Sequence, residues 1–263
     1  MSMTDKQALI DDLFALGIEP TGTLLVHSSM KAIGDVEGRA DTVLDALSDV
    51  MQDGLLLLPT HSWADDNLTS GVFDPDKEPS CVGVLTNLFR QRTGVVRSLH
   101  PTHSVAALGR NAAEFIEGEE TCTTPCPRDG VWGRLYDVDA QILLLGCDLT
   151  SNTFIHGVEE WHPVKNRIAR KSQVIRIKKG HQIIESELHR HQSPNRSIHK
   201  NYDKLEQPFL KTGVGHWGMV AQAPSFIASA KGMADLTESF LKRNPDIFLD
   251  RTPIPSQWYE KRI

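Results

Sequence analysis

Three short runs of apolar residues constrain the fold of this chain more than any other feature of its sequence. They are Thr23–Val26, Leu55–Leu58 and Ile142–Leu145, and each is followed at once by a polar cluster. Continuous apolar runs of this length are typical of parallel strands that are covered on both faces. Amphipathic segments lie between the runs, which is the strand and helix alternation of an α/β protein.

Apolar residues at helical spacing mark the segments around these runs. We expect one helix capped by Thr4 and ended by Gly17, a second over Arg39–Gln52, a third capped by Ser80, and two more at 111–117 and 230–243. Short strands are expected at Val95–Val96 and Val105–Leu108. The order of these elements predicts an α/β fold with a central, mostly parallel sheet flanked by helices.

The C-terminal half carries a different pattern. Apolar residues from Val174 to Ile177 lead into a turn at Gly180, and two isoleucines follow it. This pattern predicts a small antiparallel hairpin. The polar, histidine-rich positions 186–203 are expected to form a mobile loop. We therefore predict a single α/β domain over residues 1–263, in which approximately 170–205 is a hairpin and polar-loop subregion.

Composition argues against several classes of protein. The formal net charge of −6 disfavours a nucleic-acid partner and leaves room for a cationic ligand. No apolar run approaches the roughly 20 residues that span a bilayer, and Met1–Glu19 is too charged for a signal peptide. The cysteines at 81, 122, 126 and 147 form no CxxC pair, so we expect reduced thiols. The sequence predicts a cytoplasmic protein that binds neither nucleic acid nor membrane.

The polar clusters that follow the three apolar runs are candidates for a ligand site. They read His27-Ser28-Ser29, Thr60-His61-Ser62 and Gly146-Cys147-Asp148. Ligands of open α/β sheets bind outside the carboxyl ends of the strands, so we expect these clusters to line one crevice. A reactive Cys147, activated by the helix that follows it, is a second interpretation of the last cluster.

His156 and Glu159 are the first candidates for catalysis. A helix capped by Ser151 or Asn152 would place them three residues apart on one face. Imidazole titrates near neutral pH, so His156 could remove a proton from a nucleophile while Glu159 fixes its tautomer. The spacing alone is equally compatible with an ordinary hydrogen-bonded pair on a helix surface.

Four segments in order carry a resemblance to a known family. They are LLVHSSMKAIGDVEG at 24–38, GLLLLPTHSW at 54–63, RSLHPTHSVAALG at 97–109 and LLLGCDLTSNTFIHGVEE at 143–160. With these segments the chain resembles the aminoglycoside N(3)-acetyltransferases, which do not have the common N-acetyltransferase fold. Four ordered motifs make a more specific match than one short pattern.

The resemblance implies acetyl transfer from acetyl-CoA to a primary amine, the 3-amino group of an aminoglycoside or a related amino compound. His156 would be the general base and Glu159 its orienting carboxylate. No metal would be needed. The resemblance also implies a set of coenzyme-binding residues, in which the amides near Ser104 and Val105 would stabilise the oxyanion. That set is Ser28, Ser29, Met30, Arg97, His100, Ser104, Val105 and Ala106.

A cationic amino sugar as acceptor would need carboxylates in the crevice. The candidates are Asp65, Asp66, Asp148 and Glu160, with Asp35 as a further possibility. The family often has a larger residue where this chain has Gly157, so the acceptor pocket could differ in shape. The sequence leaves the physiological acceptor and the oligomeric state open.

Two other functions fit parts of the sequence. A metal-dependent hydrolase could use the histidines and aspartates at the predicted strand ends, although none has HExxH spacing. Those residues are His27, His61, Asp65, Asp148 and His156, together with His100 and His103. A catalytically silent protein that binds CoA or an amino sugar is the other alternative.

Overall fold

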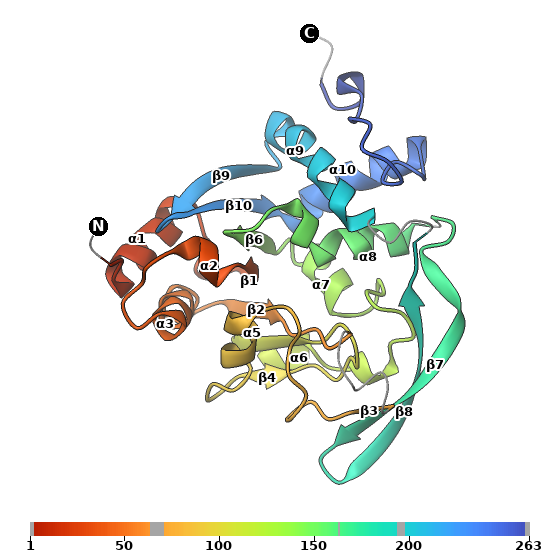
Figure 1. The fold of residues 1–263 in the computed structure, drawn as a ribbon, viewed down its shortest axis with the longest axis horizontal. Helices are drawn as coiled ribbons and strands as arrows, with labels where there is room; N and C mark the ends of the chain where they lie inside the picture. The colour runs from red at the N-terminus through yellow and green to blue at the C-terminus, as the bar shows by residue number, and fades with distance from the viewer. Residues whose placement is uncertain (1–2, 64–70, 163, 194–197, 261–263) are drawn as a thin grey trace.

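A seven-stranded sheet forms the centre of the computed structural model, which describes residues 3–63, 71–162, 164–193 and 198–260 (Figure 1). The order across this sheet is β4, β5, β2, β1, β6, β10, β9. The strands are β1 (Thr23–Ser28), β2 (Leu55–Pro59), β4 (Val96–Arg97), β5 (Val105–Gly109), β6 (Gln141–Leu145), β9 (Gly215–Val220) and β10 (Ala223–Ser229).

The three predicted apolar runs are the middle of this sheet. Leu25 of β1 lies opposite Leu57 of β2 and Ile142 of β6, and both pairings are parallel. β5 and β10 run antiparallel to these strands, while β4 and β9, each antiparallel to its neighbour, return to the direction of β1. β1, β2, β4, β6 and β9 thus share one direction, which confirms the expected mostly parallel sheet.

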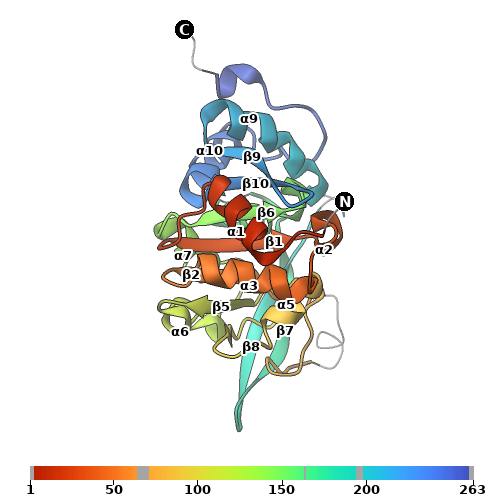
Figure 2. The ribbon, with the colours of Figure 1, turned by 90° about the vertical axis from the view of Figure 1, so that its left-hand side faces the viewer.

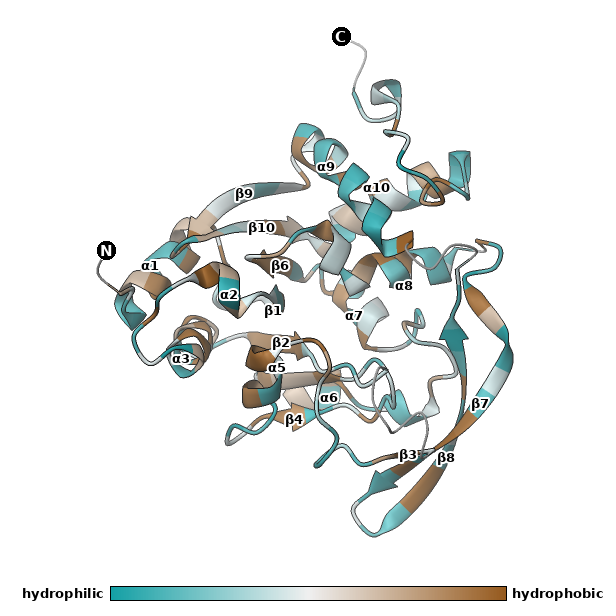
Figure 3. Cartoon of the chain, viewed as in Figure 1, coloured by the Kyte–Doolittle hydropathy of each residue, from teal (hydrophilic) through white to brown (hydrophobic). Residues whose placement is uncertain are grey.

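Helices cover both faces of the sheet, which explains why the central strands are apolar throughout (Figure 3). On β1, Leu24 and Val26 face one core and Leu25 faces the other. Helices α1 (Lys6–Ala15), α3 (Ala40–Val50) and α5 (Val84–Phe89) cover the first face (Figure 2). Helices α7 (Val131–Asp137), α8 (Thr153–Trp161) and α10 (Ala230–Arg243) cover the second.

Shorter helices join these elements. They are α2 (Met30–Ile33), α6 (Ala112–Phe115), η1 (Glu119–Thr121), η2 (Leu149–Ser151), η3 (Ile198–Leu205), α9 (Glu206–Thr212) and η4 (Ser256–Trp258). Within the described residues, the helices are too short or too polar to cross a membrane.

Two of the predicted helix caps are wrong. Asp5, not Thr4, caps α1, because its carboxylate accepts a hydrogen bond from the Ala8 amide. The helix expected after Ser80 begins only at Val84, and the Ser80 hydroxyl accepts a hydrogen bond from the Thr86 hydroxyl instead. The two alternatives for α8 are resolved in favour of Asn152, whose side chain accepts a hydrogen bond from the Phe154 amide.

The predicted hairpin belongs to a second, three-stranded sheet. It consists of β7 (Ile168–Lys179) and β8 (Gln182–His191), with β3 (Val72–Phe73) alongside β7, and it extends away from the main sheet in Figure 1. The prediction of a mobile loop at 186–203 is wrong for the residues of this segment that the structure describes. Positions 186–191 belong to β8, where Ser186 and Leu188 are buried at alternate positions, and 198–203 belong to η3.

Candidate active site

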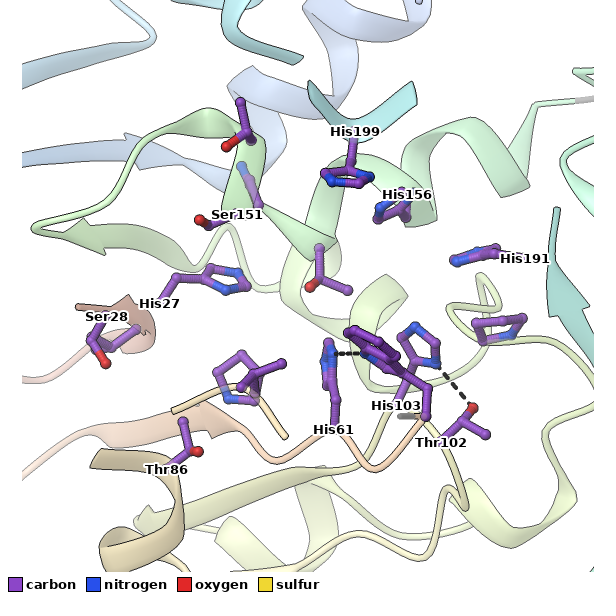
Figure 4. Close-up of a pocket in the computed structure, with 18 of the residues that line it drawn as sticks. His27, Ser28, His61, Thr86, Thr102, His103, Ser151, His156, His191 and His199 are labelled. Atoms are coloured by element: carbon purple, nitrogen blue, oxygen red, sulfur yellow. Dashed lines mark hydrogen bonds between the residues drawn. The ribbon is translucent and has the colours of Figure 1, made fainter. Parts of the chain in front are cut away.

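A cavity of about 510 Å³ opens at the carboxyl ends of β1, β2 and β6, where the sequence predicted a crevice (Figure 4). This main pocket has a volume typical of small-molecule sites. His27 and Ser28 reach it from the end of β1, His61 and Trp63 from the segment after β2, and the turn Thr150–Thr153 from the segment after β6. Its other described lining residues are Val26, Pro59, Val82, Thr86, Thr102, His103, Pro125, His156, Arg190, His191 and His199.

Histidines dominate the polar lining of the main pocket (Figure 4). The ring of His191 lies 4.9 Å from that of His156 and 5.3 Å from that of His103, measured between centroids. Burial lowers the pKa of His27 to about 4, and it lowers the pKa of His156 well below its ordinary value, with a smaller contribution from His191. His27 and His156 are therefore neutral near pH 7 and able to accept a proton.

Tyr202 of η3 connects His156 to Glu159. The Tyr202 hydroxyl donates a hydrogen bond to Glu159 Oε2, and its oxygen lies 2.7 Å from His156 Nδ1. A hydroxyl has one hydrogen, so the tyrosine oxygen must accept its second bond from Nδ1–H of His156. His156 Nε2 then carries the free lone pair, as a general base requires.

The hydrogen bonds of the described residues do not include the expected direct bond between His156 and Glu159. The Tyr202 hydroxyl lies between the two side chains instead. Glu159 is only 1% exposed, and its second oxygen accepts a bond of 2.7 Å from Arg167 Nε. A buried carboxylate needs such partners to remain charged. Glu159 thus acts on His156 from behind Tyr202. Neither Tyr202 nor Arg167 was a candidate from the sequence, because nothing in its spacing relates them to α8.

Glu160, predicted to bind the acceptor, is occupied by the protein itself. Its carboxylate accepts hydrogen bonds from the Thr124 hydroxyl and from the Cys126 amide at 3.0 Å, and His191 Nε2 lies 3.0 Å from Oε2. Its side chain is 6% exposed. Glu160 therefore forms a carboxylate and imidazole pair with His191, and it is not among the described residues that line the main pocket.

Comparison with known proteins identifies the family. Residues 25–242 match the family model of the aminoglycoside 3-N-acetyltransferases. The chain belongs to this family. The resemblance found in the sequence is thereby confirmed, and the chain is an acetyltransferase.

Two relatives and two solved structures show the extent of the likeness. The aminoglycoside N(3')-acetyltransferase-like protein YokD of Bacillus subtilis is 30% identical over 191 residues, which are 65% of this chain and 70% of that protein. Aminoglycoside N(3)-acetyltransferase IX of Micromonospora chalcea is 28% identical over 245 residues, 83% of this chain and 86% of its own. A mutant of the aminoglycoside acetyltransferase AAC(3)-IVa in complex with gentamicin has a TM-score of 0.82 at 24% identity, covering 99% of this chain and 95% of its own. AAC-IIIb with CoASH has a TM-score of 0.81 at 22% identity, with 97% and 100% covered. The two solved structures share the fold of this aminoglycoside 3-N-acetyltransferase family member.

Arg97, which the family resemblance implied as a coenzyme contact, is hydrogen-bonded within the protein. Its Nε donates to the hydroxyls of Thr60 and Ser104, and its other nitrogens donate to the carbonyls of Thr60, Pro75 and Glu78. Burial lowers its pKa to about 10. Each guanidinium nitrogen has a protein acceptor, so Arg97 ties the segment after β2 to β4 and β5.

The segment from His100 to Ala106 lies behind the main pocket. His100 is fully buried, with Nε2 3.0 Å from the Thr124 carbonyl and with Nδ1 accepting bonds from the amides of Thr102 and His103. It shapes the turn that presents Thr102 and His103 to the main pocket. His100 therefore has a structural role in this turn, and it is not among the described residues that line the main pocket.

Ser104, Val105 and Ala106 are also fully buried. The Ser104 hydroxyl donates to the Thr60 carbonyl, and the Val105 amide donates to the Ser98 hydroxyl at 3.1 Å. An oxyanion needs donors without other partners, so the Val105 amide does not fit the predicted role. Ala106 is paired with β2 and β4 on its two sides.

The remaining candidates divide between the pocket and its surroundings. Ser28 lines the main pocket, whereas Ser29 and Met30 lie at the start of α2, where the Ser29 amide donates to the Leu145 carbonyl. Asp148 is exposed and caps η2 by accepting from the Thr150 amide, outside the described lining. Asp35 is exposed as well. The predicted acceptor residues Asp65 and Asp66 lie outside the described residues.

Neither the reactive cysteine nor the metal site finds support in the described residues. Burial raises the pKa of the Cys147 thiol to about 12, so it is protonated. The one described group close enough to hold an ion is Cys126, Glu160 and His191, with ligand atoms within 4.8 Å of one another. Burial raises the pKa of the Cys126 thiol well above its ordinary value, so this sulfur stays protonated and is a poor metal ligand. The Glu160 oxygens already accept hydrogen bonds, so these residues form a hydrogen-bonded cluster rather than a metal site.

Proposed function

We propose that this chain transfers the acetyl group of acetyl-CoA to an amine of a cationic amino sugar, with His156 Nε2 as general base. The observation that carries the proposal is the hydrogen-bonded chain His156, Tyr202, Glu159 at the wall of the main pocket. It leaves Nε2 unprotonated and gives the imidazolium that forms a carboxylate to interact with. The family of this chain, which consists of aminoglycoside 3-N-acetyltransferases, supplies the reaction.

The chemistry needs alignment and proton transfer. A thioester is already activated, whereas an alkyl ammonium is not a nucleophile until it loses a proton. As the amine nitrogen attacks the acetyl carbon, His156 Nε2 accepts a proton from that nitrogen. The carbon–sulfur bond breaks, its electron pair leaves with sulfur, and His156 returns the proton to the sulfur. Arg167 fixes Glu159, so the negative charge stays beside the forming imidazolium.

The coenzyme arm is proposed to enter along Ser28 and the turn Thr150–Thr153, whose hydroxyls and amides line one side of the main pocket. Two solved structures support the ligand classes, since AAC-IIIb was solved with CoASH and AAC(3)-IVa with gentamicin. None of the described residues lining the main pocket is Asp or Glu. In this proposal the carboxylates for a cationic acceptor are therefore Asp65 and Asp66, as predicted from the sequence.

We further propose that residues 1–263 act as a single domain in the cytoplasm. The main pocket takes His27 from the main sheet and His191 from the hairpin sheet, so both are needed for one site. The four cysteines are free thiols, which fits a reducing compartment.

Thiol release from acetyl-CoA, measured across a panel of amino sugars and aminoglycosides, tests the proposal. We expect His156→Ala to lower turnover by about 10²–10⁴-fold, the usual contribution of a general base. His181→Ala is the matched control, because His181 is exposed in the turn of the hairpin and should leave turnover unchanged. Normal turnover by His156→Ala would remove it from the mechanism. Ligand-induced thermal stabilisation without any product would instead indicate the silent binding protein.

A further inference from the structure

Two protons must leave the acceptor nitrogen in the proposed reaction. Alkyl amines are largely protonated near pH 7, so the acceptor arrives as R–NH₃⁺. The product amide nitrogen keeps one hydrogen, the thioester sulfur gains one to become the thiol, and the last proton goes to water. One neutral imidazole can hold only one of the two protons at a time. A second proton acceptor in the main pocket would therefore let the amine be deprotonated before His156 is used.

His191 has the position for this role. It comes from the end of β8 and lines the main pocket, with its ring stacked on that of His156 at 4.9 Å and an interplanar angle of 30° (Figure 4). It also lines a smaller cavity of about 260 Å³ together with Gln192 and His199. Its side chain is 20% exposed. His191 therefore adjoins both the reacting groups and a route to water.

Its hydrogen bonding suits a proton acceptor. Glu160 is held by the Thr124 hydroxyl and the Cys126 amide, and its Oε2 faces His191 Nε2 at 3.0 Å. A carboxylate acceptor fixes the hydrogen of neutral His191 on Nε2, so Nδ1 carries the lone pair. The carboxylate also stabilises the imidazolium directly, whereas His156 meets its carboxylate only through Tyr202.

We propose that His191, held by Glu160, is a second catalytic base that takes the first proton from the acceptor ammonium and passes it to water. This inference rests on the proposed function. His156 then accepts the second proton during attack and returns it to the coenzyme sulfur. The order follows from electrostatics, because two stacked imidazolium ions repel each other and the first must discharge before the second forms.

Several other ionisable groups lie close to His191. They are His156 and Glu160 on α8, His61, His100 and His103 in the segments after β2 and before β5, Cys126 in the loop before α7, its neighbour Arg190, and Glu159, Arg167 and His199 in the lining of the smaller cavity. Among the described residues, Glu160 is the carboxylate hydrogen-bonded to His191, whereas Glu159 is bonded to Tyr202 and Arg167. Replacing Glu160 should therefore weaken the same step as replacing His191.

The pH dependence of kcat/KM for the acceptor tests the inference. At pH 7, His191→Gln should lower kcat/KM by about 10–100-fold. The defect should disappear above the pKa of the acceptor amine, where the first proton is already gone. His156→Gln should remain defective at both pH values, because the second proton leaves only during attack. Glu160→Gln should show a weaker form of the His191→Gln behaviour, and it provides the answer should His191→Gln not fold.

His189→Gln is the matched control, since His189 lies on the same strand, faces the Ala169 carbonyl and is not a described lining residue. It should keep the wild-type profile. A defect of His191→Gln that is equal at all pH values, or no defect at pH 7, would overturn the second base while the proposed function stands on His156→Gln. An absence of thiol release by the wild-type chain would overturn both.

Discussion

Tyr202→Phe removes one hydroxyl from the centre of the proposed base. The ring of Tyr202 is fully buried and packs 4.9 Å from that of Phe248, so phenylalanine keeps the packing. Glu159 Oε2 loses its donor, and His156 Nδ1 loses its acceptor. Leaving a buried acceptor unpaired costs about 1–3 kcal/mol of unfolding free energy, and more for a charged group. The Arg167 bond to Glu159 remains and keeps this carboxylate partly paired. We therefore expect a cost near the upper end of that range and not above it.

The effect on turnover follows from the tautomer. Without the tyrosine oxygen, no acceptor fixes the hydrogen of neutral His156 on Nδ1. The fraction of His156 side chains with an unprotonated Nε2 therefore falls. In metal sites, loss of a partner that orients a ligand typically costs about 10–100-fold, and we expect a similar factor for the partner of His156. We expect kcat for thiol release to fall by this factor with little change in KM for acetyl-CoA.

Tyr136→Phe is the control for Tyr202→Phe, because the Tyr136 hydroxyl donates to Asp235 on the surface. It should keep the wild-type kcat. Steady-state kinetics with both substrates varied, alongside thermal unfolding of each variant, separates catalysis from folding. A Tyr202→Phe protein with wild-type kcat would refute the argument that Tyr202 fixes the tautomer of His156.

Three further perturbations test other parts of the structure. Arg97→Met should lower the unfolding free energy by about 2–4 kcal/mol, because several buried carbonyl oxygens lose their donor. We expect KM for acetyl-CoA to stay unchanged, and a large rise in KM would show that Arg97 binds the coenzyme. Glu159→Gln should destabilise the fold by about 3–5 kcal/mol in chemical denaturation, since it leaves the buried Arg167 unpaired, and a neutral effect would contradict this. The folded-state pKa of His27, about 4, lies below its unfolded value of 6.5. The free energy of unfolding that neutral His27 contributes is therefore fully present above pH 6.5 and is lost as the pH falls toward 4. At 1.36 kcal/mol per pH unit this loss is about 3 kcal/mol, and His27→Gln should flatten the corresponding fall in denaturation midpoint.

The sequence predicts the location of the site because that location depends on local patterns. Leu24 to Val26 and Leu55 to Leu58 are apolar without alternation, and only a strand with helices on both faces requires this. Once the strands are parallel, their carboxyl ends meet at one edge, and the residues that follow must come together. His27, His61 and the Thr150–Thr153 turn do so.

The sequence does not predict the partners of those residues, because the partners come from distant segments. Tyr202 lies 46 positions after His156, and His191 lies 31 positions after Glu160. Both fall in positions 186–203, which the sequence predicted to be a polar loop, whereas His191 ends β8 and Tyr202 lies in η3. Arg97 was predicted as a coenzyme contact from the family resemblance and its residue type, and nothing in the sequence indicated its hydrogen bonds to Thr60, Pro75 and Glu78.

Helix α8 explains why two adjacent glutamates have different partners. Successive residues of an α-helix point about 100° apart, so the side chains of Glu159 and Glu160 leave the helix in different directions. Glu159 turns inward to Arg167 and Tyr202, and Glu160 turns toward Thr124 and His191. The residue one turn before Glu160 is His156, whose ring stacks on that of His191. One helix thus supplies a separate carboxylate to each of two neighbouring imidazoles, and a reaction that removes two protons from one nitrogen can use both.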